Sequence, residues 1–229
     1  MRVFAIGCTH NRHNELNVPD VDMIIHTGDA VSSIDPYQNL KEMNDFLLWF
    51  STLPIKHKVY VPGNHCTSMN RPSLGFKQQF EEYGVHCLMH DLVTIEGINI
   101  FGSPYTPSFG DPKWVFQVGR DKIYKKWAQI PEITDILVTH GPPTNTLSYT
   151  DDKNSGLILD VGDKALYNRM QELNISHHFF SHIHNGRWKR GQIINYGQII
   201  LGQTSYYNCS AVTDRKNELK LNPGHILEI

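Results

Sequence analysis

Short apolar runs rich in β-branched residues alternate along this chain with longer segments whose apolar positions recur every three or four residues. The first pattern is typical of buried strands and the second of amphipathic helices, so the alternation predicts an α/β fold in which helices connect strands. The expected strands are residues 3–6, 23–25, 58–61, 92–95, 98–101, 136–139 and 178–180. The expected helices are residues 37–52, 73–83, 121–130 and 164–173.

Three regions depart from this alternation. Glu96-Gly97 separates two apolar runs by a turn of hairpin length, which indicates antiparallel strands. Residues 102–112 are rich in Gly and Pro, and we expect a surface loop there. Residues 192–229 alternate β-prone runs with Gly and Asn turns. Since neither a repeat nor a linker divides the sequence, we expect a single domain over residues 1–229.

The composition is that of an ordinary globular protein, with 229 residues, 40% hydrophobic and 19% charged. The 21 Lys and Arg against 23 Asp and Glu leave a net charge of -2, so no overall field favours nucleic acid or an anionic membrane. No apolar run has membrane-spanning length and the N-terminus lacks signal-peptide features, which predicts a cytoplasmic protein. The four scattered cysteines include no CxxC pair and are expected to be reduced thiols.

Five short segments place metal-binding or proton-transferring side chains directly after an expected strand. They are Gly7-Cys8-Thr9-His10, Gly28-Asp29, Gly63-Asn64-His65-Cys66, Thr139-His140-Gly141-Pro142-Pro143 and Ser181-His182-Ile183-His184-Asn185. Because the carboxyl ends of strands in α/β sheets face one crevice, we expect these side chains to converge. Imidazole, carboxylate and amide ligands together are what a two-metal hydrolase requires.

Asp29 is the only strand-end aspartate of the five segments, so we expect it to bridge two ions. Cys8 and His10 are two residues apart, and they would share one face and could bind one ion if that stretch remains extended. His182 and His184 have the same spacing, although a loop conformation could direct them to different ions.

Asn64 offers an amide oxygen and His140 an imidazole as ligands for a second ion. Neutral ligands suit this ion, because the net negative charge of the site must stay low enough for a phosphate dianion to bind. His65 then remains for proton donation to the leaving oxygen or for stabilising charge in the transition state.

In chain order these segments resemble the motifs D-x-H, G-D, G-N-H-D/E, H and G-H-x-H of the calcineurin-like metallophosphoesterase family. Residues 24–29, 60–65, 101–107 and 135–143 are also similar to its metallophosphoesterase-domain (fetal-brain protein 239-like) subgroup, and the resemblance covers roughly residues 1–212. It implies a four-layer α-β-β-α sandwich with two mixed β-sheets. The ligands it implies at site one are Cys8, His10, Asp29 and His184, and those at site two are Asp29, Asn64, His140 and His182. His65 matches the catalytic histidine of the family.

Three positions depart from the family pattern. Cys8 replaces an Asp, Cys66 replaces the acidic residue after the motif histidine, and Ser181 replaces a Gly. A thiolate at position 8 would favour zinc or iron over magnesium. We therefore expect two divalent ions among Mn, Fe and Zn. Cys66 also weakens the expectation that a carboxylate partner holds His65.

The resemblance implies a metal-dependent phosphoesterase that hydrolyses phosphodiesters, cyclic nucleotides among them, or phosphomonoesters. The expected partner is a small phosphate ester or nucleotide, while neither a membrane nor nucleic acid is indicated, and the sequence leaves the oligomeric state open. Tyr105, Phe109 and Trp114 could stack on a nucleobase or cover the core. One alternative is a catalytically weak metal- or nucleotide-binding protein with a degenerate first site at Cys8. Another is an enzyme controlled by oxidation of Cys8.

Overall fold

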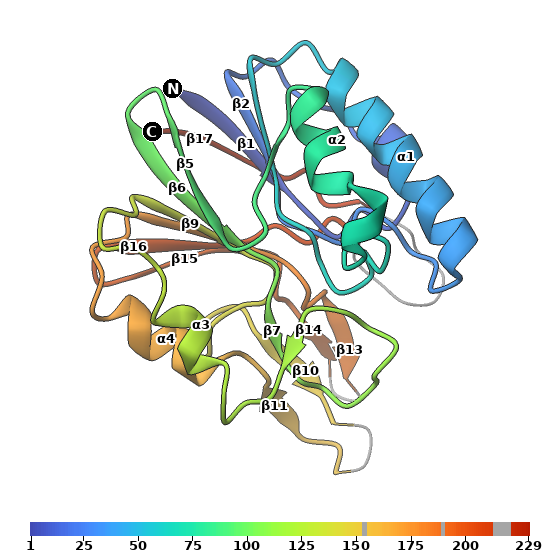
Figure 1. The fold of residues 1–229 in the computed structure, drawn as a ribbon. Coiled ribbons are helices and arrows are strands. Elements are labelled where there is room, and N and C mark those ends of the chain that lie inside the picture. The colour runs from blue at the N-terminus through green and yellow to red at the C-terminus, as the bar shows by residue number, and fades with distance from the viewer. Residues whose placement is uncertain (153–154, 189–190, 213–220) are drawn as a thin grey trace.

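Two mixed β-sheets lie at the centre of the computed structural model, which describes residues 1–152, 155–188, 191–212 and 221–229 (Figure 1). The first sheet has the order β17-β1-β2-β3-β4 and the second the order β15-β16-β12-β9-β6-β5. Helices α1 and α2 lie outside the first sheet, and α3 and α4 lie outside the second (Figure 1). The expected four-layer α-β-β-α sandwich is thereby confirmed.

Parallel strands form the middle of each sheet, and antiparallel strands form an edge. The first sheet comprises β1 (Arg2–Ile6), β2 (Met23–His26), β3 (His57–Tyr60), β4 (His86–Cys87) and β17 (His225–Glu228). The second comprises β5 (Asp91–Ile95), β6 (Ile98–Ser103), β9 (Ile136–Thr139), β12 (His177–Phe180), β15 (Gly197–Leu201) and β16 (Thr204–Asn208). The antiparallel pair β5 and β6 confirms the hairpin expected around Glu96-Gly97.

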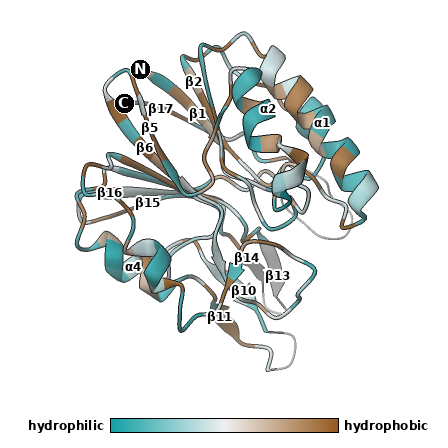
Figure 2. Cartoon of the chain, in the orientation of Figure 1, coloured by the Kyte–Doolittle hydropathy of each residue, from teal (hydrophilic) through white to brown (hydrophobic). Residues whose placement is uncertain are grey.

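Successive residues of β1 pack into different layers. Val3 and Ala5 belong to the core between the two sheets, whereas Phe4 and Ile6 belong to the core under α1 and α2. Because side chains of a strand alternate between its faces, a strand covered on both faces must be apolar throughout. Figure 2 accordingly shows hydrophobic colour on β1 and β2 of the first sheet.

Helix α1 (Pro36–Thr52) confirms the helix expected at residues 37–52. The carboxylate of Asp35 accepts hydrogen bonds from the backbone N–H groups of Tyr37 and Gln38, and Pro36 occupies the first turn, so the helix has a strong start signal. Its apolar stripe, which includes Phe46 and Phe50, is buried against the first sheet. Hydrophilic and hydrophobic colours alternate along α1, as expected for an amphipathic helix (Figure 2).

The other helices are shorter than expected. Residues 73–83 form the 3-10 turn η2 (Pro72–Leu74) and then α2 (Phe76–Glu82), because Gly75 between them is left-handed with φ 64°. Only α3 (Tyr124–Trp127) of the helix expected at residues 121–130 is α-helical, and turns with i to i+3 bonds flank it. Helix α4 (Lys164–Met170) ends three residues before the expected position 173. In each case terminal turns replace regular helix.

Residues 102–112 are not wholly a loop, contrary to our expectation. Strand β6 continues to Ser103, and β7 (Thr106–Pro107) pairs with β8 (Gln117–Val118). The short elements outside the two sheets are η1 (His13–Glu15), β10 (Tyr149–Asp151), β11 (Ile158–Asp160), β13 (Gly186–Trp188) and β14 (Gly191–Ile193). Of the region from residue 192 onward, residues 213–220 lie outside the described part.

The cysteines and the helices bear on two further expectations. Cys8, Cys66, Cys87 and Cys209 are free thiols, as expected, and all four are buried. None of the helices in the described part of the chain has the length and apolar character needed to cross a bilayer.

Candidate metal centre

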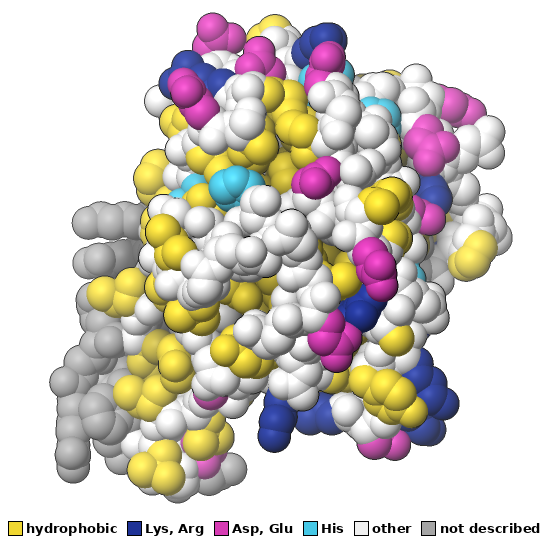
Figure 3. Space-filling view, turned by 90° about the vertical axis from the view of Figure 1, so that its left-hand side faces the viewer, with side chains coloured by type: hydrophobic (Ala, Val, Ile, Leu, Met, Phe, Trp, Pro, Cys, Tyr) yellow, Lys and Arg dark blue, Asp and Glu magenta, His cyan; other side chains and the backbone are white. Residues whose placement is uncertain are grey.

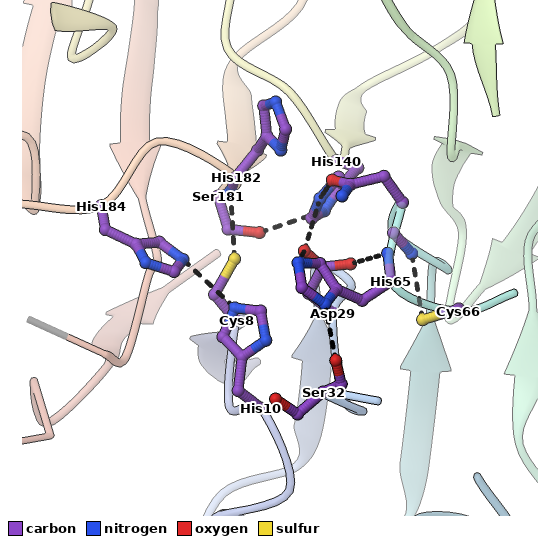
Figure 4. A network of polar contacts seen from close by, with 12 residues as sticks. Cys8, His10, Asp29, Ser32, His65, Cys66, His140, Ser181, His182 and His184 are labelled. Atoms are coloured by element: carbon purple, nitrogen blue, oxygen red, sulfur yellow. Dashed lines mark hydrogen bonds and ion pairs between the residues drawn. The ribbon is translucent and has the colours of Figure 1, made fainter. Parts of the chain in front are cut away.

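The sequence-predicted site residues gather where strands of both sheets end (Figure 4). The first sheet contributes the residues that follow β1, β2 and β3, which are Cys8, His10, Asp29, Asn64 and His65. The second sheet contributes those that follow β9 and β12, which are His140, His182 and His184. The structure therefore brings together segments that are far apart in sequence, as the strand-end rule requires.

Asp29 lies in the middle of this cluster and is 2% exposed. Its Oδ1 accepts the backbone N–H of His65 at 2.8 Å, and its Oδ2 lies 3.2 Å from Nε2 of His140. Burial by itself would raise the pKa of this carboxyl group, but the nearby imidazoles of His140 and His65 outweigh burial and hold the pKa well below its ordinary value. Asp29 is therefore a buried carboxylate anion.

Glycines make the close approach around Asp29 possible. A Cβ atom at Gly63 would collide with Oδ1 of Asp29 and lie 2.5 Å from the His140 ring. A Cβ atom at Gly28 would lie 2.5 Å from Nδ1 of His140. Gly28 also has a φ of 105°, a backbone angle that residues other than glycine rarely adopt. The glycine of each motif thus lets two loops touch at the site.

His140 presents its Nε2 to two oxygen atoms. Its Nδ1 donates to the carbonyl of Thr27 at 2.9 Å, and a carbonyl can only accept, so the neutral ring carries its proton there. Nε2 then faces Oδ1 of Asn64 at 3.0 Å and Oδ2 of Asp29 at 3.2 Å. A metal ion bound here would take the place of a proton on Nε2 and would meet all three ligand atoms. This arrangement fits a metal ion.

A second group consists of Cys8, His10 and His184, whose ligand atoms all lie within 4.8 Å of one another. Nε2 of His10 and Nε2 of His184 are 3.3 Å apart. Burial lowers the pKa of His10 to about 4, so its ring is neutral near pH 7 and its lone pair is available to a metal. These donors fit a soft or borderline cation such as zinc or iron.

The thiol of Cys8 is fully buried. Burial, together with the charge of Asp29, raises its pKa, whereas a coordinated cation acts in the opposite direction and deprotonates a thiol. Its sulfur accepts the backbone N–H of His182 at 3.1 Å. Cys8 would therefore be a thiolate ligand only with a metal bound.

The segment from Cys8 to His10 is not extended. The condition under which we expected the two side chains to share one face of a strand is therefore not met. Both residues are left-handed, with φ 46° and 44°. The backbone N–H groups of Cys8 and His10 donate to the carbonyls of Gly28 and Asp29, which holds this turn against the loop after β2. The two side chains meet because of this turn and not because of strand alternation.

His182 lies at the edge of the cluster. In the described part of the chain it belongs to none of the groups of His, Cys and acidic residues whose ligand atoms lie within 4.8 Å of one another. Its ring centroid is 5.0 Å from that of His140 and 5.3 Å from that of Phe109, and Figure 4 shows the ring turned away from Cys8. Burial lowers its pKa to about 3, so the ring is neutral near pH 7.

His65 is held by groups that the sequence motifs do not include. Its Nδ1 donates to the carbonyl of Ser32 at 3.0 Å, and its ring lies against the indole of Trp114 with centroids 4.0 Å apart. Nε2 lies 4.0 Å from Oδ2 of Asp29. Cys66 occupies the position of the acidic residue in the family motif. It is buried, and its sulfur is hydrogen-bonded to the hydroxyl of Tyr60 at 3.1 Å.

A cleft of about 680 Å³ opens over these residues. Asp29, Asn64 and His65 line its floor, and Phe109 and Trp114 line it from the loop between β7 and β8. Tyr105, the third aromatic residue of that region, packs instead against the hydrophobic core. Two of the three aromatic side chains are thus available to a ligand.

Comparison with known proteins assigns the class. Residues 1–186 match the family model of the calcineurin-like phosphoesterases, and the chain belongs to this family. The family is metal-dependent, and membership supports a metal-dependent phosphoesterase. The resemblance expected from the five motifs is thereby confirmed.

Individual relatives extend this result over the whole chain. Metallophosphoesterase domain-containing protein 1 of Homo sapiens is 30% identical over 251 residues, which cover 100% of this chain and 71% of that protein. UPF0046 protein K07C11.7 of Caenorhabditis elegans is 26% identical over 97% of this chain and 73% of its own length. The crystal structure of TT1561 of Thermus thermophilus covers 90% of this chain and 88% of its own, with a TM-score of 0.64 at 13% identity, and shares the fold.

Proposed function

We propose that this protein is a two-metal phosphoesterase that hydrolyses small phosphodiesters, cyclic nucleotides among them. The observation that carries the proposal is the convergence of acceptor atoms from Asp29, Asn64 and His140, next to the ligand group formed by Cys8, His10 and His184. Asp29 lies close to both groups and is the carboxylate able to bridge them.

The proposed ligand sets follow the family motifs. Cys8, His10, Asp29 and His184 would hold one ion, and Asp29, Asn64, His140 and His182 would hold the other. Mixed nitrogen, oxygen and sulfur donors suit Mn, Fe or Zn, and the sulfur of Cys8 favours Zn or Fe in the first position. Two such ions would polarise the phosphoryl group and lower the pKa of an attacking water molecule.

His65 is the proposed proton donor to the leaving oxygen. Its Nδ1 is occupied by the Ser32 carbonyl, so Nε2 is the atom that can carry a proton to the substrate. The side chain lines the cleft and is 23% exposed, which allows a substrate to reach it. Oδ2 of Asp29 lies 4.0 Å from this nitrogen.

The shape and charge of the molecule support a small substrate. The cleft has room for a nucleotide-sized molecule, and Phe109 and Trp114 offer aromatic faces for a base or an aryl group. The face drawn in Figure 3 carries acidic and basic side chains interspersed, with basic residues at its upper as well as its lower edge. Such a face does not favour a long polyanion. The cytoplasmic location stays a prediction.

Metal analysis combined with a simple turnover assay tests the proposal. The purified protein should contain about two metal ions per chain and hydrolyse bis-p-nitrophenyl phosphate with added manganese, iron or zinc. Chelation should abolish turnover, and the return of the metal should restore it. Fewer than one metal per chain together with no turnover for any ion would instead support the catalytically weak binding protein.

The oxidation-controlled alternative has less support. The Cys8 side chain is fully buried, whereas redox-sensing cysteines are accessible to the oxidant. Turnover of the metal-loaded protein should therefore be insensitive to brief treatment with peroxide.

A further inference from the structure

We propose that Trp114 is a positioning residue for His65, and that its indole ring takes over the orienting task of the carboxylate that the family places directly after this histidine. This inference rests on the proposed function, in which His65 donates a proton to the leaving oxygen. It concerns a side chain that belongs to none of the family motifs.

Two contacts define the orientation of the His65 ring. Its Nδ1 donates to the Ser32 carbonyl at 3.0 Å, which fixes the direction of one ring edge. The indole of Trp114 lies 4.0 Å away between centroids, at an interplanar angle of 32°, and restricts rotation of the ring plane. The ring of His10 makes a T-shaped contact with that of His65, with centroids 4.7 Å apart. The ring is thus confined with Nε2 toward the reacting centre.

Cys66 does not perform this task. Its sulfur lies 3.1 Å from the hydroxyl of Tyr60 and accepts the backbone N–H of Gly63 at 3.4 Å. It is fully buried beneath the loop, within the core under α1 and α2. Packing and a backbone carbonyl therefore replace the charged partner.

The carbonyl that binds His65 is itself rigidly held by helix α1. Backbone N–H groups of Ser32 and Ser33 donate to one carboxylate oxygen of Glu42, at 2.8 and 3.0 Å. The amide of Asn39 donates to the carbonyls of Ser33 and His65, at 2.6 and 2.7 Å. One helix thus fixes the distance between the Ser32 loop and the histidine.

The loop that carries Trp114 is also preorganised. The side-chain amide of Gln117 donates to the carbonyls of Asp111 and Trp114, at 2.6 and 3.1 Å, and accepts the backbone N–H of Phe109 at 2.9 Å. The backbone N–H of Val115 donates to the carbonyl of Asn64 at 3.2 Å. This last bond connects the residue after Trp114 with the residue before His65. Pre-positioned groups of this kind reduce the cost of reaching a reactive geometry.

Kinetics with two leaving groups test the inference. Phenol is a poorer leaving group than p-nitrophenol and depends more on a proton donor, so diphenyl phosphate and bis-p-nitrophenyl phosphate should respond differently. Trp114→Ala should lower kcat about tenfold on diphenyl phosphate, part of the roughly 10²–10⁴-fold contribution of a general acid, and much less on bis-p-nitrophenyl phosphate. Trp114→Phe should retain most of the activity, and metal content should not change.

A double-mutant cycle separates positioning from substrate binding. In a His65→Ala background, Trp114→Ala should cause no further loss of kcat, because the indole acts through the absent imidazole. An equal loss in both backgrounds, or a loss confined to KM, would overturn the inference. Lys113→Ala is the matched control, since Lys113 precedes Trp114 in the same loop and its side chain is exposed.

A structural measurement tests the contact without any turnover. The indole should shift the ring-proton NMR signals of His65 upfield, and Trp114→Ala should remove that shift while Lys113→Ala preserves it. The signals of His65 are identified by their loss in His65→Ala. If wild-type protein shows the Trp114-dependent shift but no metal-dependent turnover, the proposed function fails while the contact stands. A shift that does not depend on Trp114 would refute the contact itself.

Discussion

The two sides of the candidate metal centre differ in their donor atoms. Asp29, Asn64 and His140 present two oxygens and one nitrogen, whereas Cys8, His10 and His184 present one sulfur and two nitrogens. Oxygen donors suit harder cations, and sulfur suits zinc or iron. A single strand-end residue, Cys8, thus changes the chemistry of one side while the other keeps the donors that the family motifs specify.

The two sides are also built differently. On the His140 side, a carbonyl on Nδ1 fixes which nitrogen is free, and glycines allow the loops to touch. On the Cys8 side, left-handed backbone at Cys8 and His10 turns both side chains inward. Left-handed backbone also occurs at Asp29, the residue that the two sides share, with φ 51°. The other residues of the two sides have different local contacts, so substitutions should affect the sides separately except at Asp29.

Asp29→Ala should have the largest effect, because it removes the carboxylate between the two sides. We expect turnover to fall beyond the roughly 10²–10³-fold cost of losing one transition-state donor, since both ions lose a ligand. Measurements of kcat and of metal content on the same preparation check this. Asp20→Ala, at an exposed carboxylate, is the control. Full activity of the Asp29 variant would refute the bridging assignment.

His65→Ala should slow the chemistry and leave both sides of the centre loaded. The expected loss is roughly 10²–10⁴-fold in kcat, the usual contribution of a general acid. Elemental analysis should give the same metal content as in the wild type. If metal is lost along with activity, His65 belongs to the ligand set and its assignment as proton donor is wrong.

Cys8→Asp should change metal preference without abolishing activity. The variant should bind manganese or magnesium in preference to zinc by a ratio at least about tenfold larger than that of the wild type, or about 1.4 kcal/mol. Competition with equimolar metals followed by elemental analysis measures the ratio. Cys87→Ser is the matched control, since Cys87 is an equally buried thiol on β4. An unchanged ratio would show that Cys8 is not a ligand.

The smallest effect is expected from His178→Phe, which should change the stability of the fold and not the metal centre. His178 lies in β12, the strand that precedes His182 and His184. Burial lowers the pKa of His178 to about 3, below its ordinary value of 6.5. The folded state therefore binds fewer protons than the unfolded state between these values, so the stabilising effect of a neutral His178 is full above pH 6.5 and is lost as pH falls.

The Phe variant lacks this titration. Between pH 7 and pH 5 its free energy of unfolding should fall by about 2 kcal/mol less than that of the wild type. Urea unfolding of the metal-free proteins at both pH values measures the difference. The variant also lacks the hydrogen bond between His178 and Thr139. This loss contributes a separate, pH-independent destabilisation of about 1 kcal/mol. Parallel curves for the two proteins would contradict the expected pH dependence.

The sequence predicted the parts of the site that follow local rules. Strand-end motifs with Gly28 and Gly63 indicated where the loops converge, because close approach requires glycine there. The contacts of His10 with His184 and of His140 with Thr27 join positions 174 and 113 residues apart, and although the strand-end positions and the family resemblance placed the segments at one site, neither predicted these individual contacts. Short-range patterns contain no information on such pairs.

Other features could not be derived from sequence patterns. Trp114 gave a signal only as an aromatic residue in a Gly- and Pro-rich stretch, and nothing indicated that it packs on His65. Ser32 acts through its backbone carbonyl, which every residue possesses. The break at Gly75 was also missed, because the apolar spacing continues across it although its backbone is left-handed. Each of these depends on tertiary contacts or on backbone angles.

The assembly of the site from both sheets has a mechanical consequence. Asp29 follows a strand of the first sheet and His140 a strand of the second, so an ion held by both would act as a cross-link between the layers, in addition to their apolar packing and hydrogen bonds such as that from His140 to Thr27. Removing that ion would loosen the whole sandwich and not one surface loop, because binding energy directed at the native state becomes resistance to unfolding. The metal-free protein should then unfold at a lower temperature than the metal-loaded protein.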